Sequence, residues 1–143
     1  QRFEKAVSGA YLPRLLRAVA GAAAGAEAGF DPDDPKVDAG TVVGLRGDAA
    51  LGDAATLLIE RSADLVAAGL AALLDAYRAT GGGDARTGIL VEGTLFHKTP
   101  GYPDRVATRL RDLAPHADAV FIPNDEGGVP ANMLGAASAA LSP

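Results

Sequence analysis

The stretch ILVEGTLFHKTPGYPDR, residues 89–105, indicates how this chain folds. Residues 89–91 form a short aliphatic run directly after the glycine-rich segment TGGGDARTG. A short apolar run after a glycine cluster is typical of a buried strand in an α/β sheet. Ligands of such sheets bind beyond the carboxyl ends of the strands, which is where Glu92, Gly93 and Thr94 stand. The stretch therefore predicts a buried strand followed by a ligand site.

The composition excludes several classes of protein. The chain has 143 residues and 48% hydrophobic content, so we expect a single domain with a sizeable core. A formal net charge of −5 is not the basic footprint of a nucleic-acid binder. The absence of cysteine excludes disulfides, thiolate metal sites and a cysteine nucleophile. Without a long apolar run or a signal segment, we expect a cytoplasmic protein with no membrane partner.

The N-terminal third of the chain predicts helices and an exposed connection. A helix is expected to restart near Leu12, after a break at Ser8 and Gly9, with Pro13 in its first turn. The expected apolar stripe of this helix consists of Leu15, Leu16, Val19, Ala22 and Ala23. The following Ala/Gly tract and DPDDPKVDAG are typical of an exposed connection. Residues 41–45 are expected to form a strand or an extended loop.

The strongest helical pattern lies in GDAATLLIERSADLVAAGLAALLDAYRATGGG. Asp53 is expected to cap the start of this helix, and the three glycines are expected to end it. Two neighbouring stripes are expected to face the core. One consists of Ala63, Val66, Leu70, Leu73 and Tyr77, and the other of Leu58, Ser62, Leu65, Gly69 and Ala72.

The remainder of the chain predicts two βα units. A helix from about residue 103 to residue 113 follows the first strand, with Val106 and Leu110 facing inward. ADAVFIPND predicts a second buried strand, and GGVPANMLGAASAAL predicts a last helix. The order of the elements indicates an α/β fold with a mainly parallel sheet flanked by helices.

Four segments resemble the hexokinase family, which includes the glucokinases. FEKAVSGAYL is similar to the family's Phe-Glu-Lys-x-x-Ser-Gly-x-Tyr-Leu stretch, and RSADLVAAGLAALL to its Arg-Ala-Ala-x-Leu-x-x-Ala-Gly helix. The stretch ILVEGTLFHKTPGYPDR is similar to the family's Val-Asp-Gly-Ser-x-Tyr-x-x-x-Pro-x-Phe segment. AVFIPNDEGG resembles the family's strand before an acidic-glycine turn. The four matches occur in the family's order and spacing and span nearly the whole chain.

The resemblance implies a fold and an activity. The fold is the two-lobed sugar-kinase fold related to actin and ribonuclease H, with residues 1–143 as the C-terminal portion of the large lobe. The small lobe, the N-terminal phosphate loops and the aspartate base would lie outside this chain. Hexokinases transfer the γ-phosphoryl group of ATP, bound with Mg²⁺, to the 6-hydroxyl of a hexose. The piece alone is therefore expected to be inactive, to provide neither catalytic nor metal-binding residues, and to pair with the remainder of the hexokinase chain or self-associate.

The resemblance also implies roles for individual residues. Glu4 matches the family's sugar-binding glutamate, whose two oxygens accept hydrogen bonds from adjacent hydroxyls, and Gln1 matches a glutamine of the same pocket. The residues implied on the nucleotide side are Gly9, Ala10, Gly93, Thr94, His97 and Lys98. Each has a plainer alternative: a solvated glutamate in a first helical turn, a glycine at a turn with unusual backbone angles, and a solvent-facing histidine.

Departures from the family pattern leave the function open between two candidates. Ala39 and Val43 stand where the family has a threonine and a serine near the phosphates, although a two-residue shift puts Thr41 there instead. Val129 and Met133 add bulk to the acidic-glycine turn. The first candidate is an ATP-dependent hexose kinase, and the alternative is a non-catalytic hexokinase-like protein that binds sugar or has a regulatory role. An unrelated α/β nucleotide-binding module agrees less well with four ordered matches.

Overall fold

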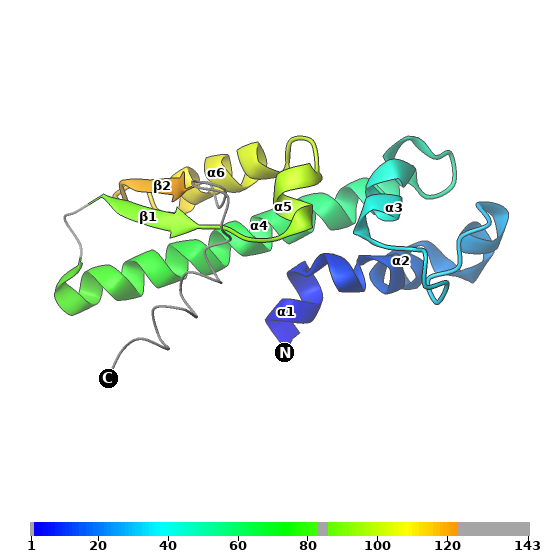
Figure 1. Cartoon of the computed structure of the whole chain (residues 1–143), viewed down its shortest axis with the longest axis horizontal. Coiled ribbons are helices and arrows are strands. Elements are labelled where there is room, and N and C mark those ends of the chain that lie inside the picture. The colour runs from blue at the N-terminus through cyan, green and yellow to red at the C-terminus, as the bar shows by residue number, and fades with distance from the viewer. Residues whose placement is uncertain (1, 83–85, 123–143) are drawn as a thin grey trace, which may run out of the picture.

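The computed structural model describes residues 2–82 and 86–122. One long helix, α4 (Gly52–Tyr77), runs through the described residues, and most of the other helices pack along it (Figure 1). The elements before it are α1 (Arg2–Val7), η1 (Gly9–Tyr11), α2 (Leu12–Glu27), α3 (Ala39–Gly44) and η2 (Leu45–Gly47). The elements after it are η3 (Arg78–Gly82), β1 (Thr87–Leu90), α5 (Thr94–Lys98), α6 (Tyr102–Leu113) and β2 (Ala119–Ile122). The predicted helix in GGVPANMLGAASAAL lies outside the described residues.

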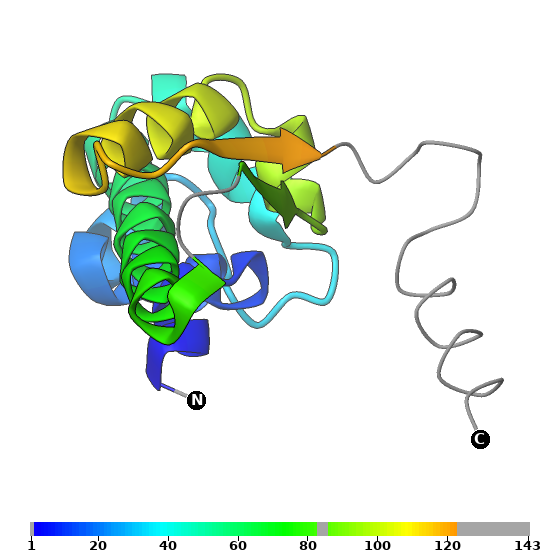
Figure 2. The ribbon, with the colours of Figure 1, turned by 90° about the vertical axis from the view of Figure 1, so that its left-hand side faces the viewer.

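The two strands confirm the predicted parallel arrangement. β1 pairs with β2 in parallel, with Thr87 opposite Ala119 and Leu90 opposite Ile122, and α6 forms the connection between them. The prediction of buried strands is wrong within the described residues, because Leu90 and Ile122 are 48% and 41% exposed. Helices α4 and α6 lie on one side of the pair (Figure 2). Side chains alternate between the two faces of a strand, so only one set packs on the core.

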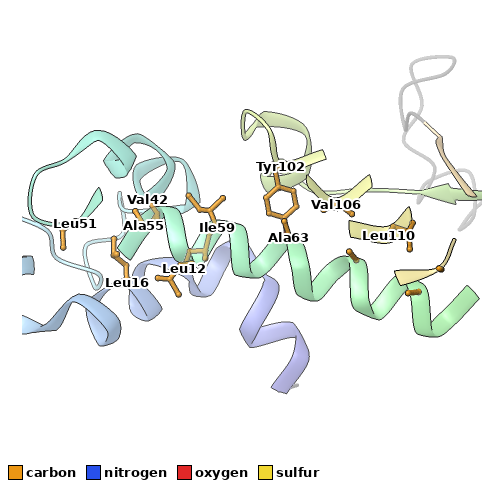
Figure 3. Packing of buried hydrophobic residues seen from close by; sticks show 14 of the residues in the cluster. Leu12, Leu16, Val42, Leu51, Ala55, Ile59, Ala63, Tyr102, Val106 and Leu110 are labelled. Carbon is orange, nitrogen blue, oxygen red and sulfur yellow. The ribbon is translucent and has the colours of Figure 1, made fainter. Parts of the chain in front are cut away.

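The buried face of α4 differs in part from the predicted stripes. Its buried residues are Gly52, Ala55, Leu58, Ile59, Ser62, Ala63, Ala67, Ala71 and Leu74. Leu73 and Tyr77, expected to be inward, are 68% and 52% exposed. The three alanines after Ser62 have small side chains, which let α6 approach closely with the buried Val106 and Leu110 (Figure 3). The position of α6, rather than the hydrophobicity of α4, therefore decides which face is buried.

The start of α4 differs from the predicted cap, whereas its end agrees with the prediction. The helix begins at Gly52, and the carboxylate of Asp48 accepts hydrogen bonds from the backbone N–H groups of Ala50 and Leu51, at 2.8 and 2.9 Å. Asp53 lies inside the first turn, where its charge still suits the helix dipole. Beyond Tyr77 the chain continues as η3, in which Gly81 has a φ of +89°. The glycines therefore end the helix as predicted.

The break at Ser8 and the start of α2 at Leu12 are confirmed. Leu16 is buried as predicted, but the later positions of the expected stripe, Val19, Ala22 and Ala23, are exposed. For Ala22 and Ala23 the cause is Gly21, whose φ of +84° and ψ of +165° interrupt the helical geometry and change its phase after Val19. The Ala/Gly tract is helical as far as Glu27, so the prediction of a connection there is wrong.

Residues 41–45 are not a strand or an extended loop, because α3 and η2 cover them. A reciprocal capping box starts α3: the backbone N–H of Thr41 donates to the Asp38 carboxylate at 2.9 Å, and that of Asp38 donates to the Thr41 hydroxyl at 3.3 Å. Val42 is fully buried on this helix. Capping and burial together outweigh the strand preference of a β-branched sequence. No helix in the part of the chain described is long and apolar enough to cross a membrane.

A cluster of charged side chains joins α6 to α4. The Nε and Nη2 atoms of Arg105 donate to the two carboxylate oxygens of Asp64 at 2.8 and 2.9 Å, and its Nη1 lies 3.1 Å from Glu60. The Nε of Arg109 lies 3.2 Å from the same aspartate. The hydrogen bond from Arg105 is the main cause that holds the pKa of the Asp64 carboxyl below its ordinary value.

We expect Asp64→Asn to lower the free energy of unfolding by about 1 kcal/mol at pH 7. The substitution removes a charge-assisted bidentate contact. We expect less than the usual energy of such a contact because the Asp64 side chain is 33% exposed to solvent. The folded-state pKa of Asp64 lies below its unfolded value, so its contribution is present above the ordinary value of 3.8 and is lost as the pH falls through the folded value. Denaturant titrations of both proteins should therefore differ at pH 7 and converge in acid.

Asp33→Asn is the matched control for this substitution. Its partner Arg14 lies 3.4 Å away, and the two side chains are 75% and 70% exposed, so stability should not change. An equal loss in both variants, or a difference for Asp64→Asn that persists in acid, would contradict the assigned role of the Arg105 contact.

Candidate functional site

A cavity of about 910 Å³ opens where β1 ends and α5 begins. Three segments that are distant in the sequence line it, together with Val66 of α4: residues 7–10, residues 37–43 and residues 91–102. In Figure 1, β1 points toward α5, and α3 lies beside α5. The cavity therefore lies beyond the carboxyl end of a parallel strand, which is the position expected for a ligand site in an α/β fold.

Most of the residues predicted for the nucleotide side line this cavity. They are Gly9, Ala10, Gly93, Thr94 and Lys98. The first two belong to η1, and the others belong to the turn after β1 and to α5. The fold thus brings together two segments that the sequence keeps far apart, which local sequence patterns do not reveal.

His97 is not among the residues that line the cavity. Its side chain is exposed, as the plainer interpretation predicted, and its Nε2 lies 3.0 Å from the carbonyl oxygen of Val91. The ring also packs edge-on against Phe96. His97 therefore helps to hold the turn between β1 and α5 in place.

Gly93 has a backbone conformation that other residues rarely adopt. Its φ is +127° and its ψ is +137°. A Cβ atom added there would meet no heavy atom within 4 Å, so backbone geometry, and not crowding by the protein, requires glycine. Thr94 follows as the first residue of α5 and is exposed at the cavity. The positive φ at this position agrees with the turn expected after the strand.

Gly9 is required for a different reason. A Cβ atom on Gly9 would lie 2.9 Å from the Cβ of Ala39, so the absence of a side chain lets η1 approach α3 closely. This contact joins two of the three segments that line the cavity. Gly9 is therefore both the break between two helices and a point of close packing.

The segment around α3 adds Asp38, which the sequence did not single out for the site. Ala39 and Val43 line the cavity, whereas Thr41 does not; the hydroxyl and N–H of Thr41 donate to the Asp38 carboxylate. Asp38 itself lines the cavity. The hydrogen bond from the backbone of Thr41 lowers the pKa of the Asp38 carboxyl, which keeps it charged. The spacing Asp-x-x-Thr is the local signal for this cap.

The charged side chains of the cavity are of mixed sign. Asp38 and Glu92 contribute two carboxylates, and Lys98 contributes one ammonium group. Apolar walls come mainly from Val7, Val37, Val66, Leu95 and Phe96. Such a cavity suits a ligand with a large uncharged portion better than a bare polyanion.

The predicted sugar-side residue lies elsewhere. Glu4 is exposed in the first turn of α1 and is not part of the cavity lining. Helix α1 projects from the body formed by the other helices (Figure 2). Gln1 lies outside the described residues. The structure therefore separates Glu4 from the residues predicted for the nucleotide side.

The parallel strand pair, with helices on one side and a cavity at its carboxyl end, is the arrangement of an α/β protein. A sequence model described as hexokinase matches residues 46–142, which is more than half of the chain. The chain belongs to the hexokinase family. The matched region includes Gly93, Thr94 and Lys98 and begins after Glu4 and Gly9.

Individual relatives agree with this assignment. The chain is 34% identical over 73 residues to Hexokinase-2 of Homo sapiens, an alignment that covers 50% of this chain and 8% of the relative. Hexokinase-2 of Rattus norvegicus is 34% identical and that of Equus caballus 33% identical, with the same coverage. The chain thus spans less than a tenth of the length of these curated relatives.

Proposed function

We propose that residues 1–143 are the C-terminal portion of the large lobe of an ATP-dependent hexose kinase. The enzyme would have the two-lobed fold related to actin and ribonuclease H, and would transfer the γ-phosphoryl group of MgATP to the 6-hydroxyl of glucose or a similar hexose. Membership of the hexokinase family supports this proposal. The exposed side chains of Leu90 and Ile122 would be covered by other elements of the larger domain.

The observation that carries the proposal is the shared cavity. Gly9 and Ala10 line the same space as Gly93 and Thr94, although the two pairs lie far apart in the sequence. Its volume of about 910 Å³ falls within the range of small-molecule sites. We assign it to the adenosine portion of ATP.

The charges of the cavity support the adenosine side rather than the phosphate side. Asp38 and Glu92 would repel phosphate oxygens, whereas adenosine carries no charge that they oppose. The ammonium group of Lys98 would donate hydrogen bonds to the ribose and attract the nearest phosphate. In phosphoryl transfer, catalysis consists mainly of positioning the reactants and stabilising charge. Within such an enzyme, the residues described here would hold and orient the nucleotide, and Mg²⁺ would arrive with the ATP.

The hexose contact is assigned to Glu4. Its carboxylate is exposed, and its two oxygens can each accept a hydrogen bond from neighbouring sugar hydroxyls. Gln1 would line the same pocket. The general base and the N-terminal phosphate loops would lie outside residues 1–143, so this chain alone would not turn over substrate.

A second candidate is a hexokinase-like protein that binds sugar or regulates a partner without turnover. The observation that favours it is that Ala39 and Val43 line the cavity, at positions where the resembling pattern has hydroxyl side chains. A coupled assay of ADP release by the full-length protein with glucose and MgATP distinguishes the two candidates. Turnover supports the kinase, and binding of both ligands without turnover supports the second candidate.

We expect Thr94→Val to weaken ATP binding and to leave hexose binding unchanged. The substitution keeps the shape of the side chain and removes one hydroxyl from the cavity, and a single neutral hydrogen bond is worth roughly 0.5–1.5 kcal/mol. The measurement is calorimetric titration of the full-length protein with each ligand separately. Thr108→Val, on the exposed face of α6, removes a hydroxyl outside the cavity lining and should change neither affinity. Unchanged ATP affinity in Thr94→Val would favour the non-catalytic candidate.

A further inference from the structure

A buried pair of hydroxyls connects three separate segments of the chain. Ser62, on α4, is fully buried, and Tyr102, the first residue of α6, is 4% exposed. The Oγ of Ser62 lies 2.8 Å from the Tyr102 hydroxyl and 2.8 Å from the carbonyl oxygen of Val7, the last residue of α1. One oxygen atom therefore joins residues that are 40 and 55 positions away from it in the sequence.

The direction of these hydrogen bonds follows from the groups involved. The Val7 carbonyl has no hydrogen, so the Ser62 hydroxyl must donate to it. The Ser62 hydroxyl has only one hydrogen, which the bond to Val7 already uses, so the Tyr102 hydroxyl must donate to the Ser62 oxygen. Burial raises the pKa of the Tyr102 hydroxyl, which keeps its proton in place at neutral pH. The three groups form one directed chain in which each bond polarises the next.

Helix α1 depends on this chain of hydrogen bonds for its position. None of its six residues is buried. Phe3 is 53% exposed and rests on Gly69, where an added Cβ atom would come within 2.9 Å of the ring. The hydrogen bond from Ser62 holds the other end of the helix against α4, at Val7. A change at Ser62 therefore acts directly on the placement of the helix that carries Glu4.

The residues at the two ends of this chain of hydrogen bonds both lie at the cavity. Val7 and Tyr102 both line it, and Figure 3 shows the Tyr102 ring pointing toward α4 near Ala63. Val7 directly precedes Ser8 and Gly9, whereas Tyr102 packs against Phe96 of α5 with their ring centroids 6.1 Å apart. In the motifs that this chain resembles, alanine and phenylalanine stand at the positions of Ser62 and Tyr102. The hydrogen bond is thus a feature of this chain rather than of those motifs.

We propose that Ser62 and Tyr102 are positioning residues that couple hexose binding at Glu4 to nucleotide binding in the cavity. The identities of the two ligands rest on the proposed function above. A hexose that draws α1 into place fixes Val7, and through the two hydroxyls it fixes Tyr102 and the wall formed by α5. Coupling of this kind is reciprocal, so the nucleotide strengthens hexose binding by the same factor.

The test measures this coupling factor in the full-length protein. Affinity for a non-hydrolysable ATP analogue is measured with and without saturating glucose, and affinity for glucose with and without the analogue. The coupling factor is the ratio of the affinity for one ligand with and without the other. In wild type this factor should lie in the range usual for coupled sites, roughly 5- to 150-fold. In Tyr102→Phe and Ser62→Ala the coupling factor should decrease to within about twofold of one, which means that the two ligands bind almost independently.

Tyr77→Phe is the matched control. It removes the same hydroxyl group from an exposed tyrosine of α4, outside the cavity lining, and should leave the coupling factor unchanged. A coupling factor that stays at the wild-type value in both Tyr102→Phe and Ser62→Ala would overturn the proposal. Independent binding of the two ligands in wild type would overturn it as well.

A ligand-free measurement separates this proposal from the proposed function. If wild type fails to bind glucose or the analogue, the assignment of the two ligands is wrong. Amide hydrogen exchange of residues 3–8 should still be faster in Ser62→Ala than in Tyr77→Phe, because the end of α1 is released. Equal exchange rates in the two variants would show that Ser62 does not position α1, and would overturn the proposal independently of any ligand.

Discussion

Glu4→Ala in the full-length protein should weaken hexose binding by roughly ten- to a hundredfold and change ATP binding far less. A carboxylate that accepts hydrogen bonds from sugar hydroxyls is typically worth about 1.5–3 kcal/mol. Glu4 is exposed on α1 and does not line the cavity assigned to adenosine, so its loss leaves that cavity intact. Separate calorimetric titrations with glucose and with ATP measure the two effects.

Two further variants make this result specific. Glu4→Gln keeps the hydrogen-bonding shape without the charge, and should lose less hexose affinity than Glu4→Ala. Glu27→Ala removes an exposed glutamate at the end of α2 and should change neither affinity. Equal losses for both ligands in Glu4→Ala would contradict the sugar role. Unchanged hexose affinity would instead identify Glu4 as a solvated residue that stabilises the start of its helix.

Gly93→Val should harm both the fold and the nucleotide site. The φ of +127° is a conformation that a β-branched residue reaches only with strain, at a cost of about 1–3 kcal/mol. An added Cβ atom would meet no protein atom within 4 Å, so this cost arises in the backbone and not from a clash. Relief of the strain would rotate the start of α5, where Thr94 lines the cavity. Denaturant unfolding and ATP titration should therefore both be affected.

Gly29→Val separates the two effects of that substitution. Gly29 also has a positive φ, of +64°, with open space where the Cβ atom would lie, and it is not part of the cavity lining. Its substitution should lower stability through backbone strain and leave ATP affinity unchanged. A loss of ATP affinity of the same size in both variants would mean that general destabilisation, and not the geometry at Gly93, explains the effect.

The sequence by itself determined the elements whose causes are local. Pro13 in a first helical turn, the break before Gly9 and the glycines after α4 predict helix boundaries that the structure confirms. The apolar run at residue 89 and the later segment ADAVFIPND predict two parallel strands with a helix between them, and the structure has β1 and β2 in parallel with α6 between them. Each of these features depends on backbone restrictions or side-chain periods within a few residues, and a sequence displays such features directly.

Only the tertiary structure decided which surfaces meet. Ala63, Ala67 and Ala71 are buried, while the larger Leu73 is exposed, because the burial of α4 depends on where α6 approaches it. Residues 41–45 contain β-branched residues that favour a strand, yet the Asp38 cap and the burial of Val42 hold most of them in a helix. The cavity shared by the segments at residues 9 and 93, and the hydroxyl chain through Ser62, join positions far apart in the sequence. Such contacts depend on the packing of distant elements, whose energy no local pattern contains.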